Sequence, residues 1–367
     1  MNIAYRFRIY PTEEQKILLG KTFGCCRFLY NQMLNDKIQE YKKTKKMLKN
    51  TPAMYKKAYP FLKEVDSLAL ANVQLHLEKA YKNFFRDPKV GFPRFKSKHH
   101  SKNSYTTNVV NGNILVEDNR IRLPKLKWIS MKKHREPAEN CRLKSVTVSM
   151  EPSGKYFASL LYEGYSCENQ AADKDYSSAK ILGIDYAMQG MAVFSEEIEM
   201  EEAGFFRKNE KRLAREQRKL SRCVKGSRNY VRQQKKVARC HEKIRSQRRD
   251  YLHKLSRRIT DQYDIVAVED IDMKAMSQCL HFGKSIQDNG YGMFRNMLDY
   301  KLAWKGKELV KADRFFPSSK KCSKCGKIKK ELKLSERVYR CTCGNEMDRD
   351  RNAAINIREE ARRMLAA

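Results

Sequence analysis

The sequence lacks any apolar run long enough to cross a membrane, and its first residues lack the apolar stretch of a secretory signal peptide. We therefore expect a cytoplasmic protein without a membrane partner. In that reducing compartment its 11 cysteines should be free thiols or metal ligands rather than disulfides. A complete phosphate-binding loop is also lacking, because Gln278 stands where the loop around Gly283-Lys284-Ser285 needs its first glycine. This excludes a nucleoside triphosphatase of that class.

Acidic residues are scarce relative to basic ones. The 367 residues include 77 Lys or Arg but only 43 Asp or Glu, which gives a net charge of +34. Such a surface repels itself and favours a polyanionic partner. A basic membrane-surface protein would concentrate its charge in one amphipathic helix, whereas here basic residues run from Arg6 to Arg363. The balance indicates nucleic acid, bound by a chain long enough for two or three domains.

The N-terminal part alternates between strand and helix signals. Residues 3–10 alternate apolar and polar side chains as a half-buried strand does, and Thr12 is a plausible cap for a helix that follows. A helical block then extends to about residue 85. Beyond it, short strands separated by Pro and Gly indicate a small β-barrel or sandwich into which the helices are inserted. We expect these strands at 104–110, 114–116, 145–150 and 156–162.

A second architecture begins after a polar linker. Residues 181–185 and 265–269 are two apolar segments that each end in an acid, as buried strands of a parallel sheet would. Residues 191–194 can pair back on the first of these segments as a hairpin. The pattern predicts a mixed sheet.

The most basic part of the chain lies between these two strands. Residues 207–258 contain 21 Lys or Arg and 4 Asp or Glu. Their apolar residues form a narrow seam with a spacing of seven, and Gly226-Ser227 marks a turn between two helices. A solvated helical face is the alternative, but such a face normally mixes both signs of charge, so we favour binding to a phosphate backbone. The seam is Tyr230, Val237, Ile244 and Tyr251, and the candidate contacts are Arg215, Arg218 and Arg222.

Two close cysteine pairs give the strongest metal signal. Cys322 and Cys325 form a C-x-x-C pair, and after 15 residues Cys341 and Cys343 form a C-x-C pair. Four thiolates separated by a hairpin-length insert can converge tetrahedrally on one Zn²⁺ ion. A redox dithiol would explain one pair but not two. We predict a closed, structural zinc site.

Three acids are candidates for a second metal site. Asp185 and Glu269 end the two apolar strands, and Asp350 precedes a helical pattern. Single acids at such places often serve as caps or turn residues, but three meeting at one sheet could hold two Mg²⁺ ions for phosphodiester hydrolysis. From spacing alone three other acids compete for these roles: Asp270, Asp272 and Asp348.

Several motifs, taken in order, resemble the TnpB family, whose members are encoded by insertion sequences and are similar to compact type V CRISPR nucleases. They are FRIYP at 7–11, FGCCRFLYN at 23–31, GFPRFK at 91–96, GID at 183–185, FPSSK at 316–320 and DRDRNAA at 348–354. The chain departs from the family in two places. Ala187 stands where the family often has glycine, and the second cysteine pair is C-x-C.

The resemblance implies a fold of the α/β plus all-β class. An N-terminal wedge β-barrel would carry a helical recognition insertion, followed by an RNase H-like (RuvC) nuclease domain with an inserted zinc ribbon. The implied boundaries are the wedge at 1–10 and 91–167, the insertion at 11–90, a linker at 168–178, the nuclease at 179–313 and 345–367 including basic helices at 205–260, and the ribbon at 314–344.

The resemblance also implies an activity and partners. Asp185, Glu269 and Asp350 match the first, second and third catalytic acids of the family, which hold two Mg²⁺ ions, with Mn²⁺ as an alternative. A guide RNA from the end of the mobile element would pair with one strand of double-stranded target DNA beside a short motif. One protein per RNA, located at the nucleoid of a prokaryotic cell when active, is the expected assembly.

The residues that read the motif beside the target are less closely defined. Six polar side chains in the helical insertion and on the adjacent strand have donors and acceptors suited to base edges, although an ordinary surface role also fits each. They are Asn72, Gln74, Lys79, Tyr105, Thr106 and Thr107. Two other functions also stay open: an RNase H-like transposase acting on its own element's ends, and a non-catalytic zinc-ribbon regulator that binds DNA.

Overall fold

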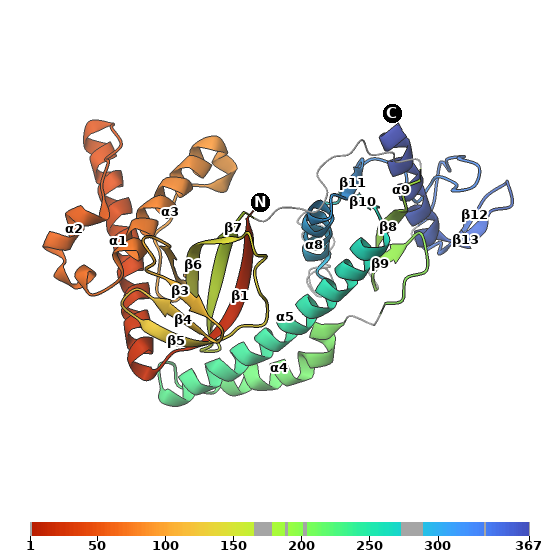
Figure 1. The fold of residues 1–367 in the computed structure, drawn as a ribbon. Helices are drawn as coiled ribbons and strands as arrows, with labels where there is room; N and C mark the ends of the chain where they lie inside the picture. Colours follow the sequence, from red (N-terminus) through yellow and green to blue (C-terminus); the bar gives the residue numbers. More distant parts are fainter. Residues whose placement is uncertain are drawn as a thin grey trace. The chain divides into compact units, whose positions relative to one another are not determined.

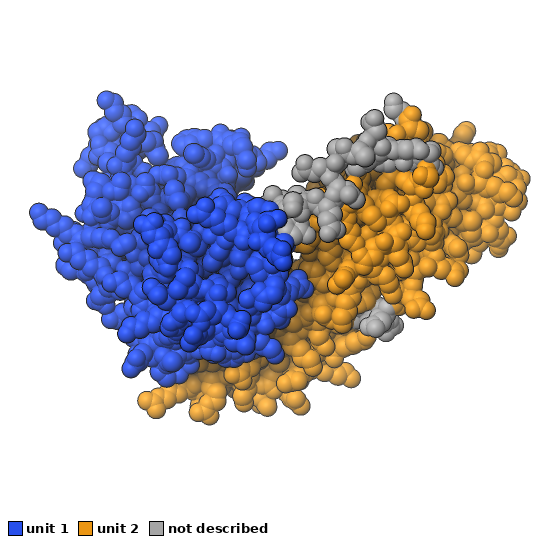
Figure 2. All heavy atoms as spheres, viewed as in Figure 1, with its two compact units in different colours: residues 1–166 blue, residues 167–367 orange. Residues whose placement is uncertain are grey.

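The structure is a computed structural model that describes residues 2–164, 178–187, 190–200, 204–272, 289–333 and 335–366. Most of the expected linker at 168–178 and Gly283-Lys284-Ser285 lie outside the described residues. The chain divides into two compact units, Met1–Ser166 and Cys167–Ala367, which Figure 2 shows in separate colours. Among the described helices, none has both the length and the apolar character needed to cross a membrane.

The first unit begins as the sequence predicts. Strand β1 covers Ile3–Tyr10 and helix α1 covers Glu13–Thr44 (Figure 1). Thr12 caps α1 through a capping box: its hydroxyl accepts from the Gln15 backbone while the Gln15 side chain accepts from the Thr12 backbone. The Gln15 amide also donates to the backbone carbonyls of Leu126 and Trp128, each at 2.9 Å. These bonds tie the start of α1 to the sheet.

Two more α-helices complete the helical block. Helix α2 covers Pro52–Ala58, and helix α3 covers Ser67–Arg86, with Asp66 as its cap. Two short 3-10 helices, η1 and η2, cover Pro60–Lys63 and Pro88–Val90. Helix α3 buries Leu70, Val73 and Leu77 on one face.

The strands of the first unit form one antiparallel sheet of seven strands in the order β2-β6-β7-β1-β5-β4-β3. Four of the later strands were predicted, whereas β4 and β5 were missed. A closed barrel would need β2 and β3, which end this order, to pair with each other. The wedge barrel therefore stays a prediction. The strands are β2 Asn103–Asn108, β3 Leu115–Glu117, β4 Arg120–Leu123, β5 Lys127–Lys132, β6 Arg142–Met150 and β7 Tyr156–Glu163.

The second unit is built on a mixed sheet of four strands in the order β11-β10-β8-β9. Strands β8 (Ile181–Ala187), β10 (Ile265–Glu269) and β11 (Glu308–Ala312) are parallel, and β9 (Met191–Phe194) returns antiparallel to β8. This confirms the predicted mixed sheet and hairpin. Nearly every residue of β8 and β10 is buried, because helices cover both faces.

The two faces of this sheet have different cores. On one face Leu182, Ile184, Val266 and Val268 pack with helix α8 (Tyr291–Trp304) and the C-terminal part of helix α5. On the other face Ile181, Ile265 and Ala267 pack against helix α9 (Arg349–Ala366) through Ile357 and Ala361. Successive side chains of a strand point to opposite faces, so every second residue of β8 and β10 lies under α9.

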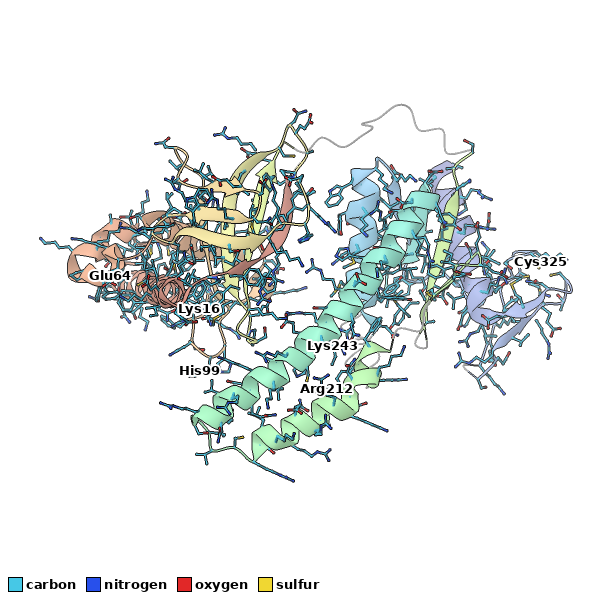
Figure 3. All side chains as sticks on the ribbon, turned by 60° about the horizontal axis from the view of Figure 1, so that its bottom comes forward. Lys16, Glu64, His99, Arg212, Lys243 and Cys325 are labelled. Carbon is cyan, nitrogen blue, oxygen red and sulfur yellow. The ribbon has the colours of Figure 1, made fainter. Side chains whose placement is uncertain are left out.

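The basic segment forms a helical hairpin. Helix α4 (Phe205–Ser221) and helix α5 (Arg228–Gln262) run side by side, and Ser227 caps α5 at the predicted turn (Figure 1). A small core that includes Leu213, Cys240 and Ile244 joins them, with Val237 packed against it. Basic side chains occupy the rest of the hairpin surface, where exposed Arg212 marks α4 and exposed Lys243 marks α5 (Figure 3).

Candidate active site and cysteine cluster

The register of the second sheet places two of the predicted acids beside each other. Ile184 on β8 pairs with Val268 on β10, so the next residues, Asp185 and Glu269, are neighbours at the carboxyl end of both strands. Every second residue of a strand points to the same face of the sheet. On β8, Ile181 and Gly183 face α9, and Asp185 is the next residue on that face. On β10, Ile265 and Ala267 face α9, and Glu269 is the next. Both carboxylates therefore belong to the α9 face.

A glycine brings α9 onto that face. A Cβ atom on Gly183 would lie 2.0 Å from the carbonyl oxygen of Ala354 and 2.8 Å from the backbone nitrogen of Arg358, both on α9. Only a residue without a side chain permits this approach of helix to strand. The Gly183 amide also donates to the hydroxyl of Ser195, the residue that follows β9, at 3.0 Å. This bond holds β8 on the side of β9. In the GID motif, Gly183 thus makes the contact with α9 and Asp185 supplies the acid.

The structure separates the roles of the two acids at the start of α9. Asp348 ends strand β13 (Glu346–Asp348), and its Oδ1 accepts from the backbone amides of Asp350 and Arg351, each at 2.9 Å. This carboxylate caps the helix. Asp350 lies in the first turn, where the Arg349 guanidinium is 3.3 Å from its Oδ1 and the Arg337 guanidinium is 3.9 Å from its Oδ2.

The three predicted acids share one electrostatic environment. Burial raises the pKa of Asp185 well above its ordinary value, and the negative charges of Glu269 and Asp350 raise it further, while Arg349 partly offsets them. The same two acids of the sheet, Asp185 and Glu269, add to the burial that raises the pKa of Tyr291 on α8. Such mutual repulsion is what a cation would relieve, so the donor set fits a divalent metal with oxygen ligands.

The other acids near these strands have different surroundings. Asp270 lies 3.7 Å from the guanidinium of Arg295 and 3.7 Å from that of Arg314, and Asp272 is exposed. Glu269 and Asp350 are the acids whose charges raise the pKa of Asp185, and with Asp185 they are the set that the resemblance predicts.

Sequence reasoning missed a hydrogen-bonding partner of this site. The hydroxyl of Ser318 donates to Glu269 Oε1 at 2.5 Å, within the range of strong bonds to a carboxylate. Ser318 is only 5% exposed. Its position inside the FPSSK motif was the only signal available, because nothing in the pattern relates it to an acid 49 residues away.

The four cysteines converge as predicted. Their sulfurs all lie within 4.8 Å of one another. The Cys322 and Cys343 sulfurs are 3.7 Å apart, and those of Cys325 and Cys341 are 3.6 Å apart. A tetrahedron with Zn–S bonds of about 2.3 Å has edges of about 3.8 Å, so these separations fit one zinc ion. Among the described residues, this is the one group of three or more His, Cys, Asp or Glu with ligand atoms so close together.

Local turns prepare the cysteine cluster for a metal. Gly326 and Gly344 follow the two knuckles with φ of 77° and 83°, a conformation that side chains rarely adopt. Burial raises the pKa of Cys322, but backbone N–H donors of Cys325 and Lys324 outweigh burial and lower it to about 6. A thiolate is the form that binds zinc. Strand β12 (Val338–Arg340) pairs with β13 behind the cluster.

The six candidates for reading bases occupy unlike environments in the first unit. Asn72 and Thr107 are buried, and the Asn72 amide donates to the Leu68 carbonyl. Gln74 donates to Glu78 at 2.9 Å, and Lys79 is exposed. Neither buried side chain can reach a base edge while its element stays packed. The remaining two, Tyr105 and Thr106, line a pocket.

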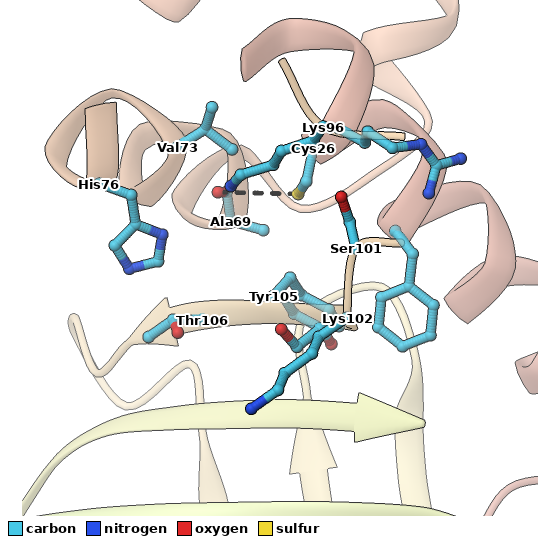
Figure 4. A pocket seen from close by; sticks show the side chains of 12 residues that line it. Cys26, Ala69, Val73, His76, Lys96, Ser101, Lys102, Tyr105 and Thr106 are labelled. Carbon is cyan, nitrogen blue, oxygen red and sulfur yellow. Dashed lines mark hydrogen bonds between the residues drawn. The ribbon is translucent and has the colours of Figure 1, made fainter. Parts of the chain in front are cut away.

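That pocket has a volume of about 190 Å³ and lies between α1, α3 and β2 (Figure 4). Lys96, Lys102 and His76 line it. Burial lowers the pKa of Lys96, and the pKa of His76 is lowered by burial and by the charges of Lys96 and Lys79. The pocket is small, and its lining mixes these basic side chains with apolar ones such as Phe23 and Val73.

Two of the family-like motifs meet beside this pocket. Asn31, from the motif at 23–31, accepts from the Lys96 backbone amide at 2.7 Å and donates to the Lys96 carbonyl at 2.8 Å. The Lys96 ammonium lies 3.8 Å from the ring centroid of Tyr30. These contacts join α1 to the segment that follows α3.

The three candidate contacts on the basic hairpin are exposed. Arg215 and Arg218 project from α4, and Arg222 ends it. Helix α5 has 35 residues and therefore extends about 53 Å, longer than one turn of duplex. The hairpin offers a long basic surface suited to a phosphate backbone.

Comparison with family models identifies three regions. Residues 164–280 match a family described as "Probable transposase", residues 291–357 match "Cas12f1-like, TNB domain", and residues 1–46 match "Helix-turn-helix domain". In the structure the described residues of the third region are strand β1 and the single 32-residue helix α1. The second region contains the four cysteines, Ser318 and Asp350.

Two curated relatives match almost the whole chain. A protein of Streptomyces pristinaespiralis named "Putative RNA-guided DNA endonuclease" is 35% identical over 366 residues, covering 96% of this chain and 88% of the relative. "Putative RNA-guided DNA endonuclease InsQ" of Escherichia coli K12 is 31% identical over 386 residues, covering 99% and 93%. Three "TnpB-like" proteins of Acanthamoeba polyphaga mimivirus are 27% identical over about a third of the chain.

A solved structure shares the fold. The chain is similar to Cas12f1 in the structure titled "Cryo-EM structure of the Cas12f1-sgRNA-target DNA complex", with a TM-score of 0.59 and 14% identity, covering 97% of this chain and 98% of that one. At this identity the likeness shows the fold alone.

Proposed function

Because the chain belongs to the TnpB family, we propose that it is an RNA-guided DNA endonuclease that hydrolyses guide-matched DNA beside a short target-adjacent motif. Asp185, Glu269 and Asp350 form its single cutting site. The observation that supports this proposal is the position of Asp185 and Glu269 side by side on β8 and β10, where burial and the charges of Glu269 and Asp350 raise the pKa of Asp185. In this assignment the second unit is a RuvC-like nuclease.

The acids have distinct parts in this proposal. Asp185 and Glu269 extend from the adjacent parallel strands β8 and β10, and Asp350 extends from helix α9, so three elements supply the three acids. Two Mg²⁺ ions bound there would activate a water and stabilise the oxygens of an in-line phosphoryl displacement. Arg349 holds Asp350 through its guanidinium, and Ser318 holds Glu269 through its hydroxyl.

The role that we propose for the cysteine cluster is structural. Its four sulfurs stand at the separations expected for a tetrahedral zinc ion, all four positions are occupied by protein ligands, and none is open for substrate. We assign one Zn²⁺ to this cluster, held by Cys322, Cys325, Cys341 and Cys343. The zinc stabilises the ribbon and takes no part in bond breaking.

The partners in this proposal are a guide RNA and double-stranded DNA, with one protein on each RNA. The basic hairpin of α4 and α5 supports them, because 21 basic against 4 acidic residues over 207–258 can hold a heteroduplex by its phosphates without reading its sequence. Arg215, Arg218 and Arg222 contact that backbone. Lys79 and Thr106 are the candidates with accessible atoms for the motif beside the target, whereas Tyr105 is only 4% exposed.

One experiment tests the proposal. The protein is purified from a host that carries its mobile element, the bound RNA is sequenced, and cutting is measured on a DNA that matches the guide region in the presence of Mg²⁺. We expect cutting that follows a redesigned guide to a new DNA and stops when the RNA is removed.

The same experiment separates the alternatives. A transposase would cut or join DNA of the element's ends without RNA. A non-catalytic regulator would bind DNA but leave it intact, and its binding would be unchanged by Asp185→Asn. Cutting that persists after RNase treatment and ignores the guide sequence would contradict the guided function.

A further inference from the structure

We propose that Ser318 is a positioning residue for the second catalytic acid, and that the cysteine ribbon holds Ser318 in place through two buried asparagines of α9. The proposal rests on the proposed nuclease function, because it assigns Glu269 to metal binding. It adds a role for the ribbon at the cutting site, beyond the stability of the ribbon itself.

The first step is the contact between Ser318 and Glu269. The Ser318 hydroxyl donates to Glu269 Oε1 at 2.5 Å, and Ser318 is 5% exposed. A glutamate side chain has three rotatable bonds, so an acid at a strand end can adopt many orientations. One short hydrogen bond to Oε1 restricts these orientations and leaves Oε2 available for a cation. Groups that orient metal ligands in this way commonly change metal affinity about 10-fold to 100-fold when they are removed.

The second step is how Ser318 itself is fixed. Its backbone amide donates to the Phe316 carbonyl at 2.8 Å, and its carbonyl accepts from the Asn356 amide at 2.7 Å. Phe316 packs against the core under α9, and Asn356 is 3% exposed on α9. The hydroxyl of Ser318 is therefore held by backbone contacts on both sides of the residue.

The third step links this segment to the cysteines. The Asn356 amide also donates to the Lys321 carbonyl at 2.6 Å, and the Asn352 amide donates to the same carbonyl at 2.7 Å. Asn352 Oδ1 accepts from the Ser323 backbone amide at 3.0 Å. Lys321 and Ser323 flank Cys322, so the first knuckle of the cluster is bonded on both sides to α9.

The network therefore reaches two of the three acids. Helix α9 starts with the turn that carries Asp350, and its two asparagines hold the knuckle and Ser318, which in turn holds Glu269. Asn352 is fully buried and Asn356 nearly so, and buried amides are costly unless their bonds are made. If the knuckle unfolds without zinc, Asn352 and Asn356 lose their bonds to Lys321 and Ser323 together. Ser318 is then no longer held in place, and the orientation of Glu269 is lost.

The first test compares Ser318→Ala with Ser318→Thr and with the control Ser319→Ala at the neighbouring, half-buried serine. Binding of Mn²⁺ to the zinc-loaded protein is followed by electron paramagnetic resonance, and the Mg²⁺ concentration for half-maximal cutting is measured alongside. We expect Ser318→Ala to weaken Mn²⁺ binding about 10-fold, with RNA binding unchanged. Ser318→Thr keeps the hydroxyl and should restore most of the affinity, and Ser319→Ala should match wild type.

A second test uses coupling. If Asn356 acts through Ser318, the effects of Asn356→Ala and Ser318→Ala on Mn²⁺ affinity should not add in the double variant. Additive effects would contradict the proposed chain of contacts, and equal Mn²⁺ affinity in Ser318→Ala and Ser319→Ala would overturn the positioning role. Melting temperatures identify any variant that has simply lost its fold. Should wild type cut no guided DNA, the proposed function fails, while the Mn²⁺ measurement still judges the role of Ser318.

Discussion

The second unit contains two candidate metal sites that differ in how far the protein chain alone prepares them. All four sulfurs lie within 4.8 Å of one another, and two of the pairs are 3.6 and 3.7 Å apart, close to the edges of a zinc tetrahedron. The three carboxylates instead repel one another, and burial with this repulsion raises the pKa of Asp185. The cysteine cluster already has the geometry that a zinc ion needs. At the carboxylate site, the repulsion between the acids would be relieved only by bound cations.

The chemistry of the ligands explains this difference. A cysteine can avoid charge by keeping its proton, so four cysteines can pack closely without a metal even though the pKa of Cys322 is lowered to about 6. Two glycines with positive φ fix their turns. Carboxylates are charged near neutral pH and resist burial together. The following changes test that contrast, from the largest expected effect to the smallest.

The largest effect is expected from Asp185→Asn. The substitution keeps the size of the side chain but removes one carboxylate of the proposed cutting site. Guided cutting should therefore fall about 1,000-fold or more, as loss of a central catalytic group typically does. Stability of the metal-free protein should be equal to or higher than that of wild type, because a repelled, buried charge has been removed. Cutting on guided DNA and thermal unfolding in a chelator are the two measurements.

The outcome of that experiment can contradict the comparison. A variant that cuts normally would remove Asp185 from the site. A variant that melts well below wild type would show that the carboxylate stabilises the metal-free fold, and the contrast with the cysteines would be wrong. Asp118→Asn, at an exposed turn between β3 and β4, is the matched control and should change neither quantity.

The second effect is expected on loss of zinc. Cys322→Ser removes a ligand and a 1%-exposed side chain, so the ribbon should unfold locally and lose several kcal/mol of local stability, since structural zinc contributes folding free energy directly. Hydrogen exchange at 316–348 measures it. RNA binding by the basic hairpin should persist. Cys141→Ser, at a half-buried thiol of the first unit, is the control, and equal exchange in both variants would exclude a structural zinc site.

A third, smaller effect is expected at the contact between β8 and α9. Gly183→Ala places a Cβ atom 2.0 Å from the Ala354 carbonyl oxygen, so α9 must move away from the sheet and carry Asp350 with it. We expect a loss of about 1 to 3 kcal/mol in unfolding free energy, as for other overpacked sites, and a clear loss of cutting with the zinc content unchanged. Denaturant unfolding, cutting and zinc analysis measure these.

Gly20→Ala is the matched glycine control. Gly20 is exposed within α1, and no atom lies within 4 Å of the Cβ that the substitution adds. Since alanine favours a helix interior over glycine, this change should stabilise the protein by about 0.5 to 1 kcal/mol. Normal cutting by Gly183→Ala would show that the close approach of α9 is not needed to place Asp350.

The smallest effect is expected in the pH dependence of stability. Because the pKa of Asp185 is raised in the fold, the folded protein binds a proton that the unfolded chain releases, so stability should fall as pH rises from the ordinary carboxyl range of about 4 through the raised pKa. Urea unfolding in a chelator at a series of pH values measures this slope. The slope should be weaker in Asp185→Asn than in wild type, and identical slopes would contradict the shift.

Much of the fold and site follows from the sequence because local patterns determine it. The two apolar segments at 181–185 and 265–269 belong to neighbouring parallel strands of one mixed sheet, and the capped helix after Thr12 is present. Spacing alone also predicted the cysteine cluster. These features depend on residues close together in the chain, or on a single register.

Features that depend on distant contacts escaped prediction. Sequence alone could not choose between Asp348 and Asp350, because the choice depends on which carboxylate caps α9. The Ser318 contact joins segments 49 residues apart. Asn72 carried a base-reading hypothesis because its side chain is polar, yet it is buried and bonded within its own helix. A polar residue type in a helix does not reveal which face it occupies.

Helix α9 has a consequence for how this protein is made. It supplies Asp350, and it also covers Ile181, Ile265 and Ala267 on one face of the sheet. A chain terminated anywhere before residue 349 therefore lacks an acid and exposes apolar strands at the same time. We expect such incomplete products to be cleared by proteolysis or to aggregate before they can cut, so premature termination should yield no unguided nuclease in the cell.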